Sequence, residues 1–278
     1  MAVTRPTLAF LGAGRVATAL GLAWQARGYT ITAVGSRNPA SARRLAEQLA
    51  CRVEPFPQAD LVFLSVPDDQ IAAVARAWLG NNGQGALIHT SGVHSLALFP
   101  NISQNQFGTF HPAYPFGPQT RLTGEEGLLI GIEATSAELS QMLEGVALDL
   151  GGRPVFLPAD AKARYHLAAV VASNYLVTLF EFARSLYAQV GVPAELNTAT
   201  VLTLMQGALQ NLVVYPPAQA LTGPIARGDL ATLHLHLAAL EQTPWLALYC
   251  QLGLHTVDLA PDLQPEQRQQ IKTLLTRL

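Results

Sequence analysis

A glycine-rich turn near the start of the chain most constrains what the chain can fold into. The apolar run Leu8–Leu11 leads into the hexapeptide Gly12-Ala13-Gly14-Arg15-Val16-Ala17, a GxGxxA pattern that opens a helical stretch. Gly12 permits a tight turn, Gly14 lets the backbone approach a pyrophosphate, and the small Ala17 lets helix and strand pack closely. The helix N-terminus offers free N–H groups to phosphates. Because the turn opens a βαβ unit, it predicts a dinucleotide-binding site.

The first part of the chain alternates short apolar runs with helical stretches. Strands are expected over residues 8–11, 30–35, 61–66, 86–89, 107–111, 128–132 and 154–157. Helices are expected over residues 15–27, 39–50, 69–79 and 136–150. Near-continuous apolar strands that alternate with helices predict an α/β Rossmann domain, with a mostly parallel sheet covered on both faces.

After Pro158 the sequence shows no further convincing strand. Helices are expected over residues 160–190, 193–212, 229–240, 244–259 and 265–278. Proline punctuates this part at helix starts and in turns. We therefore predict two domains: a dinucleotide-binding domain over residues 1–157, and an all-helical substrate and dimerisation domain over residues 158–278.

The end of the second expected strand indicates which dinucleotide is bound. A fold that prefers NAD usually carries Asp or Glu there, about 20 residues past the glycines. This chain reads Gly35-Ser36-Arg37-Asn38 and has no acid. Arg37 can fork onto a 2′-phosphate and Ser36 can donate a hydrogen bond, while Arg15 can add charge. We predict NADP; the alternative for Arg37 is an exposed arginine in a loop.

Polar residues follow three other expected strands, at the edge where ligands bind in open α/β sheets. They are Ser65-Val66-Pro67-Asp68, His89-Thr90-Ser91-Gly92 and Phe110-His111-Pro112. We expect Ser65, Val66, Pro67 and Ser91 to contact the cofactor. His89 and His111 are candidates for substrate contact or acid–base work, and the alternative for each is a structural hydrogen bond.

A polar stripe runs along the first long helix of the second domain. At 100° per residue, His166 and Ser173 fall within about 40° of Lys162, and Asn174 flanks them. Four polar groups on a mostly apolar helix need partners if they are buried. We predict that the stripe faces the nicotinamide; the alternative is a solvated helix start followed by a helix–helix hydrogen bond.

The composition excludes some partners and favours one. Charged residues make up 13% of the chain, about half the usual share of roughly 25%, and the net charge is −2. That charge supplies no basic field for nucleic acid. A chain with so little charge covers its own surface poorly, which favours a homodimer through the helical domain.

Membrane and metal sites are not expected. The most apolar stretch, residues 167–180, is 14 residues long and contains polar side chains, so we predict a buried helix instead of a membrane span. The start of the chain lacks the features of a signal peptide, which favours the cytoplasm. Cys51 and Cys250 have no metal or redox spacing, and His234 and His236 point to different faces of a helix.

Taken together, these motifs resemble a family over nearly the whole chain. The family joins a Rossmann-like domain of the pyrroline-5-carboxylate reductase and 3-hydroxyacid dehydrogenase type to a helical domain of unknown function numbered 2520. The matching residues are Gly12-Ala13-Gly14, Ser36-Arg37, Ser65-Val66-Pro67, His89-Thr90-Ser91-Gly92, His111-Pro112, the run from Lys162 to Asn174 and the run from Thr222 to Asp229.

The resemblance implies an NADP-linked oxidoreductase that is dimeric through its helical domain. In the 3-hydroxyacid dehydrogenases a catalytic lysine precedes an asparagine by four residues. Here His166 stands four after Lys162, and the nearest asparagine is Asn174. Thr222 loosely resembles a threonine in the helical domain of the pyrroline-5-carboxylate reductases.

We therefore expect hydride transfer between NADPH and a small carbonyl or imine in the interdomain cleft; a non-catalytic NADP sensor is the alternative. For a carbonyl, Lys162 is the expected proton donor, because partial burial lowers the pKa of a lysine. His166 would tune or replace it, and Asn174 would hold the substrate. For a protonated imine, Lys162 would bind a carboxylate instead.

Overall fold

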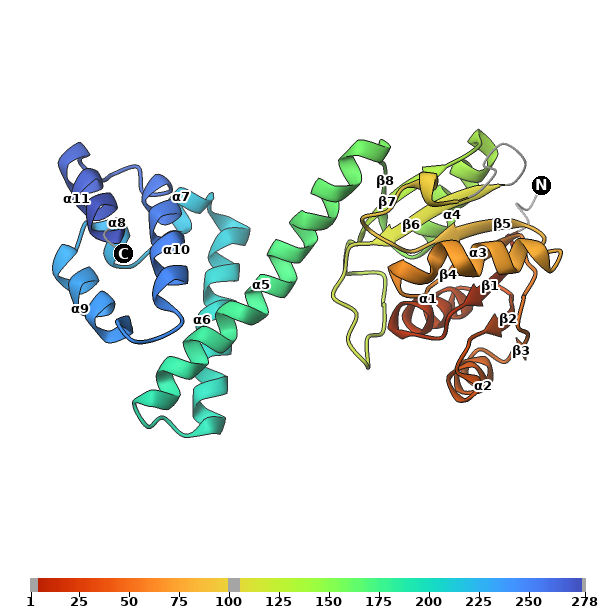
Figure 1. Ribbon diagram of the computed structural model, residues 1–278, viewed down its shortest axis with the longest axis horizontal. Helices are drawn as coiled ribbons and strands as arrows, with labels where there is room; N and C mark the ends of the chain where they lie inside the picture. Colours follow the sequence, from red (N-terminus) through yellow and green to blue (C-terminus); the bar gives the residue numbers. More distant parts are fainter. Residues whose placement is uncertain (1–4, 100–105, 277–278) are drawn as a thin grey trace. The chain divides into compact units, whose positions relative to one another are not determined.

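The computed structural model describes residues 5–99 and 106–276, and the chain divides into two compact units, Met1–Tyr175 and Leu176–Leu278. The first unit is built on one sheet with helices on both faces, and the second is helical (Figure 1). This is the fold class predicted from the sequence.

Eight strands form the sheet, in the order β3-β2-β1-β4-β5-β6-β7-β8. Their bounds are β1 Leu8–Leu11, β2 Ile31–Gly35, β3 Arg52–Val53, β4 Leu61–Leu64, β5 Ala86–His89, β6 Phe107–Pro112, β7 Leu129–Ala134 and β8 Arg153–Phe156. Every neighbouring pair is parallel except β6 and β7, so the sheet is mostly parallel, as predicted. The order of β1 to β6 is that of a doubly wound dinucleotide-binding sheet.

Helices cover the sheet on both faces. The helices of this unit are α1 Arg15–Ala26, α2 Pro39–Gln48, α3 Ile71–Gly80 and α4 Ala137–Asp149. Successive residues of β1 alternate between two buried clusters. Leu8 and Phe10 pack in a cluster with α1, α2 and α4, whereas Ala9 and Leu11 pack in a cluster with α3. A strand buried on both sides explains the continuous apolar run in the sequence.

The helical part follows without strands among the described residues. Its helices are α5 Lys162–Gln189, α6 Ala194–Val214, α7 Pro217–Ala220, α8 Pro224–Arg227, α9 Leu230–Leu240, α10 Leu246–Asp258 and α11 Pro265–Leu275. A small core that includes Ile225, Leu233, Val257 and Ile271 holds α8 to α11 together.

The change from strands to helices falls between β8 and α5, close to the boundary expected at residues 157 and 158. The first compact unit nevertheless continues to Tyr175, inside α5. The reason is local: Lys162 and Tyr165, in the first turn of α5, hydrogen-bond to the sheet. The first turns of the helix therefore belong structurally to the α/β unit.

The prediction that residues 167–180 form a buried helix is wrong for the single chain. These residues lie in a helical run of 31 residues, Ala159–Gln189. In the most apolar 18-residue window of this run, 6% of the residues are buried. By length and composition alone, that run could cross a membrane. The large apolar side chains Leu167, Val171, Tyr175 and Val177 are exposed. A helix that is apolar on all sides is normally covered by other elements.

Candidate functional site

One cavity of about 890 Å³ in the α/β unit brings together most of the predicted cofactor residues. Those that line it are Gly12, Ala13, Gly14, Ser36, Arg37, Ser65, Val66 and Pro67. They follow β1, β2 and β4, at the carboxyl ends of the strands. In open α/β sheets ligands bind in this crevice, next to the point where the strand order reverses.

The two glycines of the turn have different tasks. Gly12 has a φ of +107°, and a Cβ built there would overlap the carbonyl oxygen of Ser65. The turn therefore requires glycine for its own backbone. A Cβ on Gly14 would meet no described heavy atom within 4 Å, so it would project into open space. Gly14 leaves room beside the free N–H groups of α1, as a pyrophosphate requires.

The loop after β2 holds the residues that were predicted to bind a 2′-phosphate. Asn38 caps α2, because its Oδ1 accepts from the backbone N–H groups of Ala40 and Ser41 at 3.0 and 3.1 Å. Arg37 is exposed at the cavity and makes no hydrogen bond or ion pair within the described chain. No carboxylate follows β2 at this point to compete for it. The residues present therefore fit NADP.

Three predicted cofactor residues do not line the cavity. Arg15 is exposed at the start of α1, and Val16 packs against the core. Ser91 is buried, and its hydroxyl donates to Asp68 Oδ2 at 2.9 Å and accepts from the backbone N–H groups of Val93 and His94. Cofactor contact by these three residues stays a prediction.

Sequence reasoning missed Gln70, which lines the cavity at the start of α3. Its side-chain oxygen Oε1 is buried without a hydrogen-bond partner. Buried polar atoms normally have partners, so this oxygen fits a site that a ligand donor completes. Nothing in the local pattern could single out Gln70, because its role depends on where α3 lies against the strands.

Lys162 is buried in the sheet and does not face a cleft. Its side chain is 1% exposed, and Nζ donates to Thr109 Oγ1 at 2.7 Å and to His94 O at 2.8 Å. Glu133 Oε2 lies 3.7 Å from Nζ. Burial lowers the pKa of Lys162 to about 8, while Glu133 acts to raise it. The ammonium group of Lys162 thus has two hydrogen-bond acceptors and one carboxylate beside it within the α/β unit. Its role as a proton donor stays a prediction.

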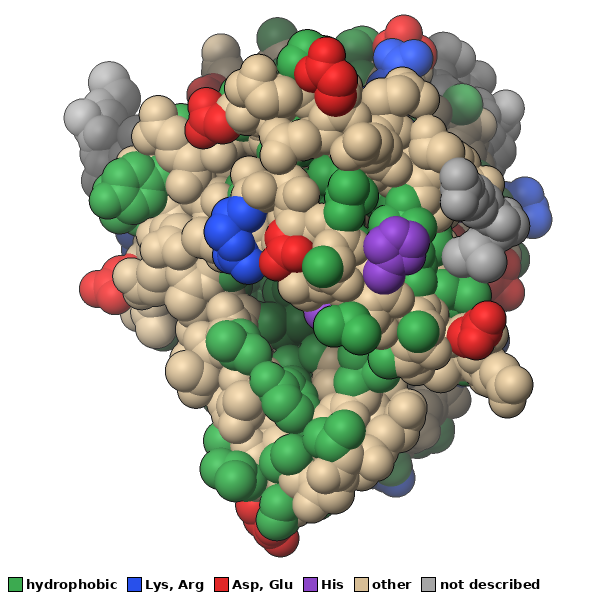
Figure 2. All heavy atoms as spheres, turned by 90° about the vertical axis from the view of Figure 1, so that its left-hand side faces the viewer, with side chains coloured by type: hydrophobic (Ala, Val, Ile, Leu, Met, Phe, Trp, Pro, Cys, Tyr) green, Lys and Arg blue, Asp and Glu red, His purple; other side chains and the backbone are tan. Residues whose placement is uncertain are grey.

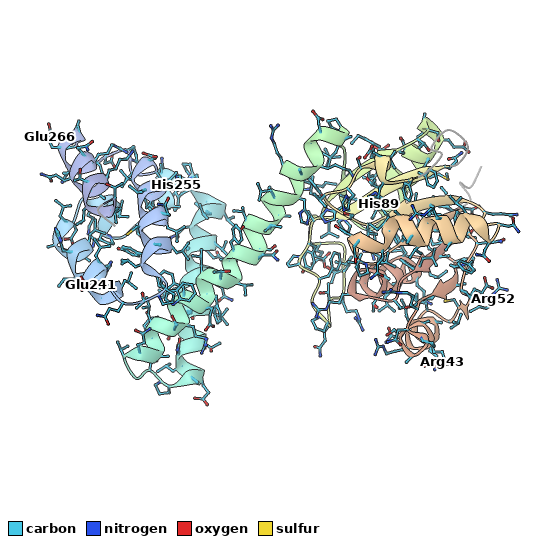
Figure 3. The ribbon with its side chains drawn as sticks, in the orientation of Figure 1. Arg43, Arg52, His89, Glu241, His255 and Glu266 are labelled. Atoms are coloured by element: carbon cyan, nitrogen blue, oxygen red, sulfur yellow. The ribbon has the colours of Figure 1, made fainter. Side chains whose placement is uncertain are left out.

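His89 is also structural. The side chain is fully buried at the end of β5 in the α/β unit (Figure 3). Its Nδ1 accepts from the backbone N–H of Ser91 at 3.3 Å, and its Nε2 lies 3.4 Å from Ser95 O. Burial, with a smaller contribution from Lys162, lowers the pKa of His89 to about 3. The burial and the hydrogen bonds of His89 fit the structural alternative.

His111 and His166 do come together. Their ring centroids are 5.7 Å apart, and His111 Nδ1 lies 3.2 Å from the hydroxyl of Tyr165. A Cβ on Gly92 would lie 2.7 Å from His111 Nε2 and 2.5 Å from His166 Cδ2, so both rings pack against the backbone of Gly92. Burial lowers the pKa of His111 to about 4, helped by His166 and Lys162.

The rest of the predicted stripe does not join this cluster. Ser173 Oγ lies 2.6 Å from Ala169 O and 2.9 Å from Asn174 Oδ1, so both polar side chains bond within their own helix. Eleven residues of helix place Ser173 about 16 Å from Lys162 along the axis. Thr222 is exposed in the helical unit.

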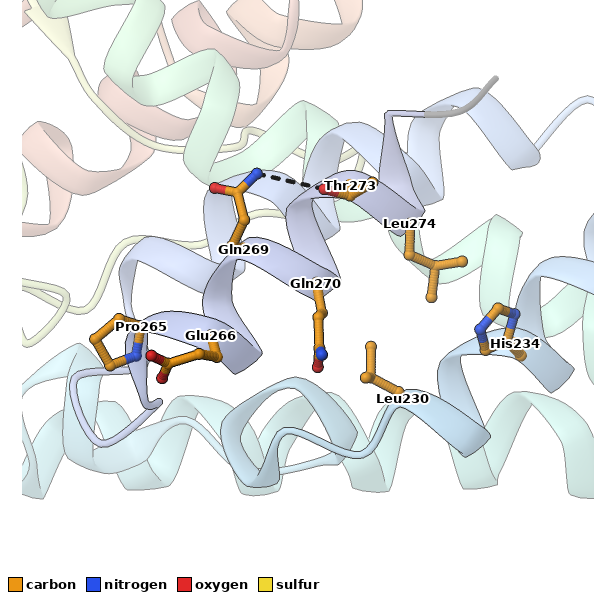
Figure 4. A pocket seen from close by; sticks show the side chains of 8 residues that line it. All are labelled: Leu230, His234, Pro265, Glu266, Gln269, Gln270, Thr273 and Leu274. Carbon is orange, nitrogen blue, oxygen red and sulfur yellow. Dashed lines mark hydrogen bonds between the residues drawn. The ribbon is translucent and has the colours of Figure 1, made fainter.

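The helical unit has a separate cavity of about 640 Å³ between α9 and α11, which includes His234, Glu266 and Gln270 (Figure 4). None of the predicted site residues line it. His234 is not paired with His236, whose Nδ1 lies 2.8 Å from the hydroxyl of Tyr249. Within residues 5–99 and 106–276, no three His, Cys, Asp or Glu side chains are grouped as metal ligands.

Comparison with known proteins adds two family matches. Residues 7–90 match the model for NADP oxidoreductase, coenzyme F420-dependent, and residues 128–256 match the domain of unknown function 2520. A search of curated proteins finds no match to the sequence.

Solved structures resemble the whole chain. A Bacteroides fragilis protein, named for an inferred NADP oxidoreductase activity, has 25% identity and a TM-score of 0.78, over 91% of this chain and 98% of that one. Protein TM1727 from Thermotoga maritima has 26% identity and a TM-score of 0.71, over 96% and 99%. A 1-pyrroline-5-carboxylate reductase from Streptococcus pyogenes has 15% identity and a TM-score of 0.62, over 97% and 99%.

Proposed function

We propose that the chain, whose two parts match the models for NADP oxidoreductase and for the domain of unknown function 2520, transfers a hydride between NADPH and a small carbonyl or imine. The observation that carries this proposal is the cavity, which combines the glycine turn with an unpaired Arg37. Bound NADPH supplies the hydride, and the protein supplies binding and orientation. The interdomain location of the substrate stays a prediction.

The residues of the cavity divide the work of holding NADP. The backbone at Gly12 to Gly14 and the start of α1 would bind the pyrophosphate. Ser36 and Arg37 would bind the 2′-phosphate. Ser65, Val66 and Pro67 would lie against the far end of the dinucleotide. The hydroxyl of Thr90 lies 3.5 Å from Ser65 Oγ, so the loop that leads to Gly92 and the histidine pair begins beside this end.

We expect NADPH to bind at least tenfold tighter than NADH, because a forked arginine–phosphate contact contributes about 1.5–3 kcal/mol. Arg37→Ala should remove most of this preference and leave NADH affinity nearly unchanged. Fluorescence titration of both nucleotides measures it. Arg76→Ala is the matched control, since Arg76 is exposed on α3 and does not line the cavity. Equal affinities in the wild type would count against NADP selection by Arg37.

We also propose a homodimer through the helical domain. Large apolar side chains are exposed along α5 and α6, among them Val177, Leu204, Leu209, Val213 and Val214. On the face of the helical unit that Figure 2 presents, hydrophobic side chains gather around a hollow. A stable homodimer typically buries upward of roughly 2,000 Å², mostly apolar. A second copy of these helices would supply that area and cover α5.

Light scattering at micromolar concentration should give twice the chain mass of 29.7 kDa. Val213 is 84% exposed, and Val213→Asp should shift the protein to monomers because it buries an unpaired charge in the contact. Leu148→Asp is the matched control, since Leu148 is an exposed apolar residue on α4. A wild-type protein of 29.7 kDa would contradict the dimer.

A further inference from the structure

The two ring nitrogens of His111 have different surroundings. Nδ1 lies 3.2 Å from the hydroxyl oxygen of Tyr165. Nε2 has no hydrogen-bond partner in the described chain. The fully buried side-chain polar atoms without a partner are Gln70 Oε1 and Asn197 Oδ1, among the described residues. Nε2 is not one of them, so it is not fully buried.

The contacts of Tyr165 determine which nitrogen of His111 carries the proton. The Tyr165 hydroxyl has one hydrogen, and it donates to His111 O at 2.9 Å. The hydroxyl oxygen accepts from the backbone N–H of Gly131 at 3.2 Å. Leu129 O lies farther from the hydroxyl, at 3.4 Å, so we place the hydrogen in the bond to His111 O; a lone pair then faces His111 Nδ1, and Nδ1 is the donor. Burial raises the pKa of Tyr165 to about 12, so its hydroxyl stays protonated. In the neutral ring, Nε2 then carries a lone pair and no hydrogen.

His111 lies near the carboxyl end of β6, on the edge of the sheet where the carboxyl ends of β1, β2 and β4 line the cofactor cavity. A Cβ on Gly92 would lie 2.7 Å from Nε2, so the nitrogen stands directly beside that backbone. Gly92 follows Thr90, whose hydroxyl lies 3.5 Å from the cavity residue Ser65. His111 Nε2 therefore lies beside Gly92, two residues after Thr90, whose hydroxyl is close to the cavity residue Ser65.

We propose that Tyr165 holds His111 in the Nδ1–H tautomer, and that His111 Nε2 binds a hydrogen-bond donor at the reacting end of the substrate, either an N–H or an O–H. This rests on the proposed function, because a redox substrate must reach the carboxyl ends of the strands. His111 is then the residue that touches substrate, and Tyr165 is a positioning residue.

The tautomer restricts which chemistry the site favours. A protonated imine carries an N–H that Nε2 can accept. When hydride adds to its carbon, the C=N π electrons move to nitrogen, and the neutral amine forms without an added proton. An alcohol that is oxidised can give its O–H proton to Nε2 while its C–H hydride passes to NADP⁺, which leaves a carbonyl. A bare carbonyl that gains a hydride becomes an alkoxide and needs a proton, which Nε2 lacks in this tautomer.

The surroundings of His111 keep the ring neutral near pH 7. His166 faces it from α5, and Lys162 and His89 lie behind it; Glu133 partly balances the charge of Lys162. Burial and the positive charges lower the pKa of His111 to about 4. The acceptor is thus available above about pH 5, and it is lost as the ring is protonated below that.

The tautomer can be read without any turnover. Long-range ¹H–¹⁵N spectra of ¹⁵N-histidine protein distinguish Nδ1–H from Nε2–H, and His111→Gln assigns the signals. We expect the Nδ1–H form of His111 at pH 7, and a mixture of tautomers in Tyr165→Phe. Tyr175→Phe is the matched control, since Tyr175 is exposed on the same helix. An Nε2–H form, or a charged ring at pH 7, would overturn the proposal.

Three probes of similar size test the ligand class on the NADP⁺-loaded protein: pyrrolidinium, cyclopentanol and cyclopentanone. We expect the Nε2 signal of His111 to move with pyrrolidinium or cyclopentanol, and the stronger response identifies N–H or O–H as the donor. An equal response to all three, including none, would overturn the ligand class. NADPH titration separately tests the proposed function, so the two failures are distinguishable.

Discussion

We expect Lys162→Met to lower the free energy of unfolding by about 3 kcal/mol, because removing one partner of a buried ion pair leaves the other uncompensated. Glu133 would lose the ammonium 3.7 Å from its Oε2. The carbonyl of His94 and the hydroxyl of Thr109 would each lose a donor. These bonds join the loop after β5, the strands β6 and β7, and the first turn of α5. The variant should therefore also disturb the position of Tyr165 and His166.

Urea denaturation measures this loss, and the chain supplies its own control. Lys272, the other lysine, forms an exposed ion pair with Asp258 at 2.8 Å, so Lys272→Met should leave the unfolding free energy nearly unchanged. Adding Glu133→Gln to Lys162→Met should recover part of the loss, because it removes the unpaired charge. Equal stability of the two lysine variants would show that the buried pair contributes little.

The second large effect concerns the glycine turn. Gly12→Ala should lower the free energy of unfolding by about 3 kcal/mol or more, for two reasons. A side chain at this positive φ strains the backbone, and its Cβ would overlap the carbonyl oxygen of Ser65. Gly14→Ala is the matched control: φ at Gly14 is −86° and its Cβ meets open space. Thermal unfolding of the two variants measures the difference. Similar melting temperatures would contradict the geometry of the turn.

Local motifs made most of the cofactor site predictable. The turn at Gly12 to Gly14, the pair Ser36-Arg37 and the tripeptide Ser65-Val66-Pro67 each follow a buried strand. Parallel strands bring their carboxyl ends to one edge, so strand pattern alone placed these residues together. The two-residue strand β3 was missed because both of its residues are exposed and carry no apolar pattern.

The contacts of Lys162 and His166 with the sheet could not be predicted in the same way. Thr109 and Glu133 meet Lys162 only because β6 and β7 pair antiparallel with Thr109 opposite Glu133, a register that the sequence does not show. Helical periodicity placed Lys162 and His166 on one side of α5. It could not show that Lys162 enters the sheet while His166 meets His111. The exposed apolar side chains of α5 were likewise not predictable, because a helix that is apolar on all sides is normally covered.

Titration of NADPH against the wild type and Gly14→Ala tests the central claim most directly. A side chain at Gly14 would occupy the space that the pyrophosphate needs, without disturbing the free protein. The account predicts one NADPH per wild-type chain and an affinity at least about tenfold weaker in Gly14→Ala, a difference of about 1.4 kcal/mol. No binding to the wild type, or equal affinity in the two proteins, would contradict it.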